Sequence, residues 1–207
     1  MAMGTRALSK EIKSDTWEQE LARRMCLATS EDTVRGMFFN STLQVLRSVG
    51  GAGLVKRCVE AGGEERFLDF FRYPIRVQCQ MVTTALPELA EVYGGAEEAL
   101  RQLGRLAAMH FLEVGAGRVL LSLSWRTPRQ VLSTLPTAYR LAVSFGEYML
   151  QWTGACSGRF ILRGDFMPHP YHEGVVSTLL ELGGGREVWV RGRQTGGLDS
   201  ECEFRWQ

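Results

Sequence analysis

The hydrophobic pattern of this chain changes near Gly154, and that change limits the folds that it can adopt. Over 201–206 (ECEFRW), apolar and charged residues alternate strictly, which is typical of a strand with one buried face. Segments 157–166 and 187–193 also read as strands, whereas 170–182 has helical spacing and ends at three glycines. We therefore expect a strand, a helix and two further strands after Gly154.

Before Gly154, apolar residues recur at helical spacing. The clearest case is 96–115, where Ala96, Leu100, Leu103 and Ala107 share one face. Segment 117–125 is ambiguous between a strand and a helix, and we favour a helix. We predict a first helix after an N-cap at Asp15, a second around Phe39, Leu43 and Leu46 that ends at Gly50, and a third over 54–62. A further helix covers 75–85, and Pro87 opens or kinks its continuation. The last two helices of this portion begin at Pro128 and cover 136–152, respectively.

The predicted fold class is α+β, with a helical N-terminal portion followed by a three- or four-stranded antiparallel sheet packed against helices. A chain of 207 residues has the length of one domain. We expect a flexible leader over 1–14 and a single domain over 15–207. Its helical portion covers about 15–153 and its sheet-containing portion about 154–207, and the 136–152 and 170–182 helices cover the sheet.

Charge and cysteine usage exclude several classes of function. The 24 Lys and Arg nearly balance the 23 Asp and Glu, and neither sign runs in blocks, so we expect no nucleic-acid partner. No stretch approaches eighteen uninterrupted apolar residues, and the N-terminus has no signal-peptide core. Five scattered cysteines without a C-x-x-C pair indicate reduced thiols. We expect a cytoplasmic protein without a membrane span.

The sequence has no strong motif for nucleotide binding, catalysis, metal binding or haem binding. Gly50-Gly51-Ala52-Gly53 follows a helix rather than a strand, and neither a P-loop nor a G-x-S-x-G motif is present. His169 and His172 could bind a metal with Asp165 and Glu173, but a polar loop that starts a helix is the favoured interpretation. His110 ends an apolar helical stripe, where a core histidine is commoner than a haem ligand. We predict no catalytic residues and no enzyme.

The C-terminal segment 171–206 resembles the ending of 4-vinyl reductase-type ligand-binding domains. The shared features are a helix with Gly174 near its start, a glycine stop, two antiparallel strands and the ending Glu201-Cys202-Glu203-Phe204. Those domains are related in fold to haem–nitric-oxide-binding domains and to subunits of eukaryotic transport-particle tethers. Over nearly its whole length the chain also resembles a paralogous family of uncharacterised myxobacterial proteins, on these segments: DTVRGMFFNSTL (32–43), FRYP (71–74), LGR (103–105), LPTAYR (135–140) and HEGVV (172–176).

This chain departs from the metal-holding members of the resembled families. Zinc-holding members carry an acidic residue and a cysteine on the penultimate strand, where this chain has Arg191 and Gln194, so only Cys202 remains. Haem members have a proximal histidine followed by Tyr-x-Ser-x-Arg. Here 122–126 lacks the tyrosine and follows His110 too closely. We therefore expect no metal and no cofactor, and Cys202 becomes a small core residue.

The resemblance implies an apolar pocket between the sheet and the helices. The leading hypothesis is a non-enzymatic sensory or ligand-binding module for a hydrophobic or aromatic small molecule. The alternative is a protein-interaction or scaffold subunit that binds no small molecule. The candidate pocket residues, which are aromatic or flexible residues on elements flanking the sheet, are Tyr139, Phe145, Met149, Trp152, Phe160 and Phe166.

We also expect the chain to form a homodimer. The apolar segments 37–39 and 67–71 and the outward-facing Trp189 exceed what a small helical layer over a short sheet can cover. Two-fold dimers are the commonest soluble oligomers, and the resembled families often pair through their helical portions.

Overall fold

The computed structural model describes residues 16–49, 51–63, 66–113 and 127–207, and it confirms the predicted α+β class. The predicted leader and the ambiguous segment 117–125 lie outside these ranges. The helices are α1 (Trp17–Leu27), α2 (Gly36–Val49), α3 (Gly51–Gly62), α4 (Ile75–Tyr93), α5 (Ala96–Glu113), α7 (Pro128–Ser133), α8 (Leu135–Ala142) and α9 (His169–Leu182). The strands are β1 (Thr33–Arg35), β2 (Arg72–Pro74), β3 (Glu147–Gly154), β4 (Ser157–Arg163), β5 (Trp189–Gln194) and β6 (Ser200–Arg205).

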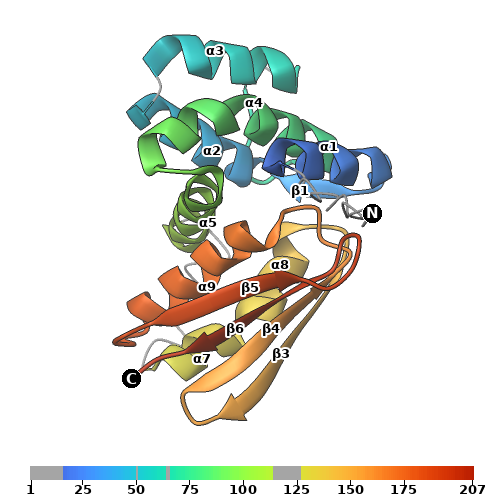
Figure 1. The fold of residues 1–207 in the computed structure, drawn as a ribbon. Helices are drawn as coiled ribbons and strands as arrows, with labels where there is room; N and C mark the ends of the chain where they lie inside the picture. Colours follow the sequence, from blue (N-terminus) through green and yellow to red (C-terminus); the bar gives the residue numbers. More distant parts are fainter. Residues whose placement is uncertain (1–15, 50, 64–65, 114–126) are drawn as a thin grey trace, which may run out of the picture.

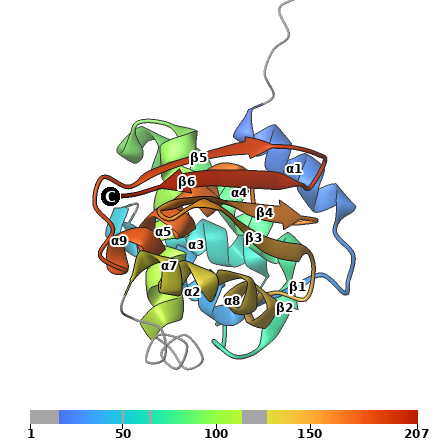
Figure 2. The ribbon, with the colours of Figure 1, turned by 90° about the horizontal axis from the view of Figure 1, so that it is seen from below.

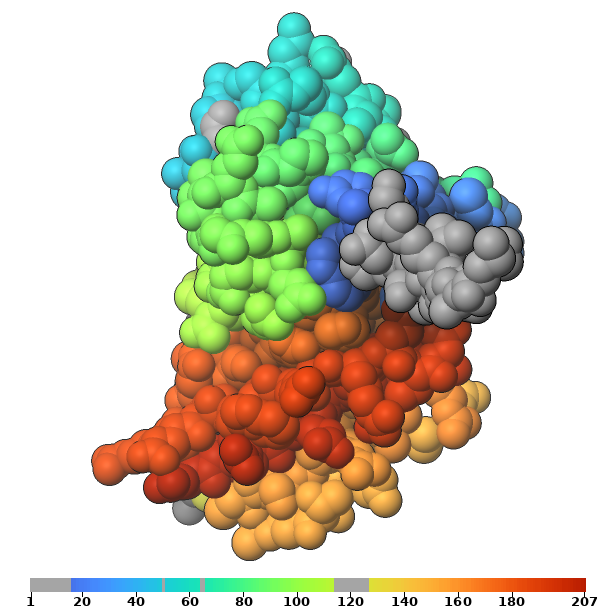
Figure 3. Space-filling view, in the orientation of Figure 1, coloured from blue at the N-terminus to red at the C-terminus, as the bar shows by residue number. Residues whose placement is uncertain are grey.

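The molecule has a helical half and a sheet half. Figure 1 shows α1 to α4 in the upper half and the sheet in the lower half, with α5 and α9 between them. The two halves meet along a broad boundary in the space-filling view (Figure 3). Buried side chains from both halves form one continuous core. None of the helices that the structure describes is long and apolar enough to cross a membrane.

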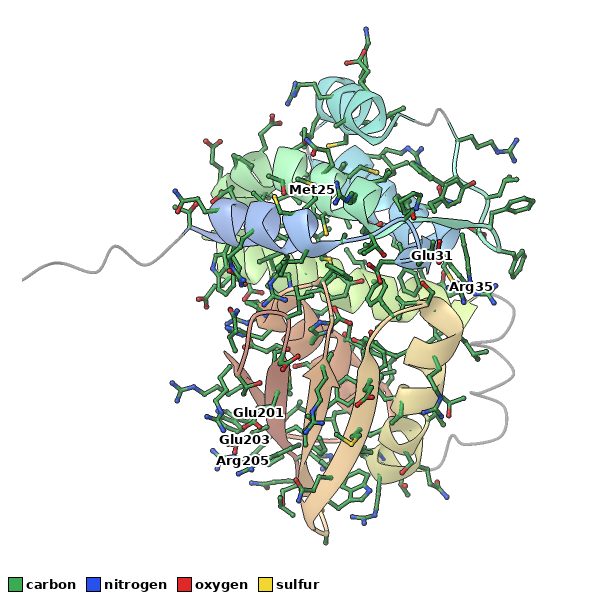
Figure 4. The ribbon with its side chains drawn as sticks, turned by 90° about the vertical axis from the view of Figure 1, so that its right-hand side faces the viewer. Met25, Glu31, Arg35, Glu201, Glu203 and Arg205 are labelled. Carbon is green, nitrogen blue, oxygen red and sulfur yellow. The ribbon has the colours of Figure 1, made fainter. Side chains whose placement is uncertain are left out.

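The sheet is antiparallel with four strands in the order β3, β4, β6, β5. Its inner face packs against α8 and α9 (Figure 2), and the paired residues Phe160 and Cys202 on that face have no solvent exposure. Glu201, Glu203 and Arg205 follow one another along β6 on the side away from α8 (Figure 4). The alternation seen in the sequence thus separates a core face from a charged face.

Several predicted helices are confirmed, and one predicted cap is wrong. Helices α2, α3, α5, α7 and α9 lie where helical spacing predicted them. The N-cap of α1 is Thr16 rather than Asp15. Thr16 Oγ1 accepts the backbone N–H of Gln19 at 3.4 Å, and Gln19 Oε1 accepts the N–H of Thr16 at 3.0 Å. This reciprocal capping box explains why the helix begins at Trp17.

The predicted helix over 136–152 is wrong beyond Ala142. Helix α8 ends there, and β3 begins at Glu147 after Gly146, which has a φ of +77°. In β3, Tyr148 faces the core, while its neighbour Met149 faces solvent. Aromatic residues at 148 and 152 fit both a helical and a strand period, and pairing with β4 decides in favour of the strand. The sheet-containing portion therefore begins about seven residues before the predicted boundary at 154.

Helix α4 covers the predicted helix over 75–85 and its expected continuation at Pro87 as one element. It runs to Tyr93 with Pro87 inside it. Leu86 and Leu89 lie on either side of Pro87 and have no solvent exposure. Burial of these leucines offsets the hydrogen bond that the proline cannot donate, so the segment stays helical.

Helices α5 and α9 touch through glycines, and this contact joins the two halves. A Cβ added to Gly104 would lie 1.9 Å from the Tyr171 carbonyl oxygen. A Cβ added to Gly174 would lie 2.0 Å from the Arg101 carbonyl oxygen. These distances leave no room for a side chain, so the two backbones can approach this closely only because both residues are glycines. Beside this contact, the buried carboxylate of Glu173 forms an ion pair with Arg101 Nε at 2.5 Å.

We predict that Gly174→Ala destabilises the protein by about 1–3 kcal/mol or more, because its Cβ would force α5 and α9 apart. Gly53→Ala is the matched control. The nearest atom to its Cβ is the Arg57 guanidinium at 3.7 Å, so this helical position should gain about 0.5–1 kcal/mol. Urea unfolding measures both variants, and equal stability of the two would contradict the close contact.

We also predict that Cys202→Ser destabilises the protein by about 1–3 kcal/mol, because it buries a hydroxyl among apolar side chains. Cys202 is fully buried, whereas Cys156 is exposed, so Cys156→Ser should change the free energy of unfolding by less than about 0.5 kcal/mol. Chemical denaturation followed by fluorescence gives both values. An unchanged midpoint for Cys202→Ser would mean that β6 has a different register.

Candidate ligand-binding cavity

A mostly apolar cavity of about 80 Å³ lies between the helical half and the sheet half. Helices α2, α4 and α5 supply one side, and α8, α9 and the loop 164–168 supply the other. The apolar lining residues are Val34, Phe38, Ile75, Ala107, Ala108, Phe111, Leu112, Leu135, Ala138, Ala142, Val143, Phe145, Met167, Val175 and Leu179. The polar and phenolic lining residues are Gln78, Thr134, Tyr139, Asp165, Tyr171 and His172.

Two of the expected pocket residues, Tyr139 and Phe145, line this cavity. Phe166 and Phe160 lie directly behind them in the core. The Phe166 ring packs edge-on against Phe145 at 4.9 Å between centroids, and the Phe160 ring lies 5.2 Å from that of Tyr139. These two phenylalanines support the cavity wall without forming it.

The other two expected residues lie away from the cavity. Met149 is 41% exposed on the outer face of β3. Trp152 packs edge-on against Phe204 at 5.6 Å, and the Arg129 guanidinium lies over its ring at 4.0 Å. Their aromatic or flexible character predicted a pocket role, but Met149 faces solvent and Trp152 packs against Phe204 and Arg129.

One end of the cavity carries a buried polar network. His172 is 1% exposed, and its Nε2 lies 3.1 Å from Asp165 Oδ1, while its Nδ1 lies 2.7 Å from the Tyr139 hydroxyl. Tyr148 donates its hydroxyl to Asp165 Oδ2 at 2.7 Å, and the Met167 N–H donates to Oδ1 at 2.8 Å. The carboxylate is thus fully hydrogen-bonded although it is buried.

The neighbours of His172 determine where its hydrogens lie. Nε2 faces two acceptors, the Asp165 carboxylate and the Met167 carbonyl oxygen at 3.1 Å, so Nε2 must carry a hydrogen. In a neutral ring, Nδ1 then accepts the hydroxyl proton of Tyr139. Burial by itself raises the pKa of Asp165, but attraction to His172 and the hydrogen bonds that it accepts hold that pKa below its usual value.

The Tyr139 hydroxyl in this network stays protonated. Burial, together with the nearby Asp165, raises the pKa of the Tyr139 hydroxyl well above its usual value, so Tyr139 remains a neutral phenol. Thr134 supplies the aliphatic hydroxyl among the described lining residues, and it donates to the Val131 carbonyl. The lining that the structure describes therefore offers no activated nucleophile.

Arg24 holds the loop that carries Asp165. This arginine is fully buried, and its Nη1 donates to the carbonyl oxygens of Asp165 and Met167 at 3.0 Å each. Its Nε donates to Glu20 at 2.6 Å on the same helix. In the sequence, the spacing of four residues between Glu20 and Arg24 is a signal of this pairing.

Gln78 is a lining residue that sequence reasoning missed. It is 3% exposed and lies on α4 between the buried residues Ile75 and Val82. A polar residue on an otherwise apolar helical stripe was the available signal, because a buried amide needs hydrogen-bond partners.

The expected metal candidates separate into two pairs. His169 Nδ1 lies 3.1 Å from Glu173 Oε1, whereas His172 faces Asp165. Among the residues that the structure describes, no three His, Cys, Asp or Glu side chains are grouped to hold a metal ion. Arg191 is exposed on β5, so it does not meet the buried Cys202.

The residues present do not fit haem either. Both ring nitrogens of His172, the histidine of the described lining, are already hydrogen-bonded within the protein. His110 lies on α5 but is not among the lining residues. A cavity of about 80 Å³ is also far below the roughly 300 Å³ at which sites for drug-sized ligands begin.

Solved structures show the same fold. An unliganded Fe(II) H-NOX protein from K. algicida matches 84% of this chain and 96% of its own, with a TM-score of 0.67 and 11% identity. An H-NOX protein from S. oneidensis in the Fe(II)NO ligation state matches 84% of this chain and 99% of its own, with a TM-score of 0.67 and 9% identity. An oxygen-binding H-NOX domain related to soluble guanylate cyclases matches 84% of this chain and 95% of its own, with a TM-score of 0.59 and 12% identity. Such low identities establish the fold and no more.

A family model also matches most of the chain. The model described as "Protein of unknown function (DUF2378)" matches residues 27–207, which include every lining residue and every element after α1. No curated protein matches the sequence.

We predict that the purified protein binds neither zinc nor haem in stoichiometric amount, because the described residues contain no group of three metal-ligating side chains and both ring nitrogens of the lining histidine His172 are already hydrogen-bonded. Elemental analysis and an absorption spectrum of freshly purified protein check this, before and after incubation with haemin. A Soret band that persists after gel filtration, or one zinc ion per chain, would contradict the prediction.

Proposed function

We propose that this chain, which belongs to the DUF2378 family, is a non-enzymatic sensory or ligand-binding module for a small hydrophobic or aromatic molecule. The observation that carries the proposal is the apolar cavity with a polar network at one end, the usual composition of a small-molecule site. The names of similar structures support it, since they describe an oxygen-binding domain and an Fe(II)NO ligation state.

The cavity volume limits the size of the ligand. An engineered apolar cavity of roughly 150 Å³ binds benzene. This cavity of about 80 Å³ therefore accepts, without rearrangement, a molecule smaller than benzene. Phe38, Phe111 and Phe145 line the cavity, and contacts between aromatic rings are more favourable than their buried area alone suggests.

The remaining observations agree with a module of this kind. The neutral Tyr139 and the fully engaged His172 are suited to hydrogen bonding rather than to proton transfer. All five cysteines are free thiols, which supports a reducing compartment, and we place the protein in the cytoplasm on that ground.

We predict that a small molecule co-purifies with the wild-type protein and is absent from Ala138→Leu, whose larger side chain would fill the cavity from α8. Thr137→Leu is the matched control, because Thr137 lies on the exposed side of the same helix. Native mass spectrometry measures the bound mass. A wild-type protein that carries no ligand and is not stabilised by small aromatic molecules would favour the scaffold alternative.

Exposed phenylalanines support a further part of the proposal, that the chain forms a homodimer. Phe70 and Phe71 are 64% and 62% exposed on the segment between α3 and β2. The expectation that segments 37–39 and 67–71 leave apolar side chains uncovered was partly wrong, because Met37, Phe39 and Phe67 are buried in the core. Adjacent exposed aromatic residues are typical of an interface, and two-fold dimers are the commonest oligomers.

We predict that the wild-type protein sediments as a dimer at micromolar concentration and that Phe70→Glu converts it to a monomer without unfolding it. Burying a carboxylate in an apolar interface is the physical reason. Val92→Glu is the control, since Val92 is 57% exposed on α4 and should leave the dimer intact. A wild-type species of 23.2 kDa would contradict the dimer.

A further inference from the structure

Gln78 has a buried carbonyl oxygen without a hydrogen-bond partner. Its side chain lines the cavity, the residue is 3% exposed, and Oε1 has no partner among the described residues. A buried amide oxygen left unpaired costs about 1–3 kcal/mol relative to one that is hydrogen-bonded. Such an atom therefore needs an explanation in a core that is otherwise apolar here.

The orientation of the amide follows from its neighbour Thr42. The Thr42 hydroxyl donates its hydrogen to the Phe38 carbonyl at 3.1 Å, so its oxygen is left as an acceptor. Gln78 Nε2 donates to that oxygen at 3.1 Å. In this arrangement the amide nitrogen is hydrogen-bonded and the oxygen Oε1 is the atom left without a partner.

We infer that the cavity ligand carries a hydrogen-bond donor, an N–H or O–H group, and that Gln78 Oε1 accepts it. This inference rests on the proposed ligand-binding function and names the chemical class of the ligand. Neighbouring lining residues such as Ile75, Phe38 and Ala108 present apolar surface to the rest of the molecule. The ligand class is thus a compact aromatic molecule, smaller than benzene, with one polar hydrogen.

Tyr139, another polar lining residue, differs from Gln78 in this respect. Its hydroxyl already shares a hydrogen bond with His172 Nδ1 at 2.7 Å, whereas Gln78 Oε1 has no partner among the described residues.

Pyrrole and furan test this directly. Both are five-membered aromatic rings of nearly the same shape, but pyrrole has an N–H where furan has an oxygen. We expect pyrrole to bind the wild-type protein about threefold to tenfold more tightly, the effect of one net hydrogen bond to a neutral acceptor. Titrations followed by ¹H–¹⁵N NMR give both dissociation constants and report on the Gln78 side-chain amide.

The variant Gln78→Met tests whether Gln78 causes the tighter binding of pyrrole than of furan. Methionine has a similar length and flexibility but no amide oxygen, so the variant should bind the two rings equally, with its affinity for furan unchanged. Tyr139→Phe should keep the preference for pyrrole. A thermal melt checks that both variants fold, and the comparison of the two rings in the wild-type protein needs no variant.

The outcomes separate the two proposals. Equal binding of pyrrole and furan to the wild-type protein would overturn the donor requirement and leave the ligand-binding function standing, with a trapped water as the partner of Gln78. A preference that survives in Gln78→Met would also overturn it. Binding of neither ring would overturn the proposed function and the donor requirement together.

Discussion

The close crossing of α5 and α9 is the contact on which the rest of the structure depends. Gly104 and Gly174 bring the two backbones so near that an added Cβ would lie within 2.0 Å of a carbonyl oxygen of the other helix. Because α5 belongs to the helical half and α9 to the sheet half, their separation sets the width of the boundary. Ala108 on α5 and Val175 on α9 line the cavity beside this contact. The glycines therefore determine how much space remains between the halves.

Polar groups stabilise the same boundary without opening it to water. Glu173 on α9 accepts from Arg101 on α5 at 2.5 Å and from the Gly192 N–H on β5 at 2.8 Å, so one carboxylate connects three elements. Burial alone raises the pKa of Glu173, but its hydrogen bonds from His169, Arg101 and Gly192 hold that pKa below its usual value. At pH 7 the carboxylate is charged and paired, which is the condition under which a buried charge is tolerated.

The fold is shared with H-NOX proteins, whereas the interior is this chain's own. A TM-score of 0.67 at 11% identity means that the arrangement of helices and sheet persists while the side chains differ. In this chain the cavity is small, its histidine is hydrogen-bonded on both sides, and Gln78 Oε1 has no hydrogen-bond partner among the described residues. Function must be argued from such a site rather than from the fold that carries it. The lining that the structure describes holds no group of three metal-ligating side chains.

The sequence by itself determined the elements whose signals are local. Alternation over 201–206 predicted a strand with Cys202 inside, and helical spacing predicted α5 and α9, because burial on one face leaves a period in the sequence. It also suggested Tyr139 and Phe145 as pocket residues. Only the tertiary structure decided that 147–154 is a strand, since pairing with β4 is a long-range contact that overrides an ambiguous local period. Likewise, only the crossing of α5 and α9 decided where a cavity remains, and the burial of Gln78 there depends on residues far apart in the sequence.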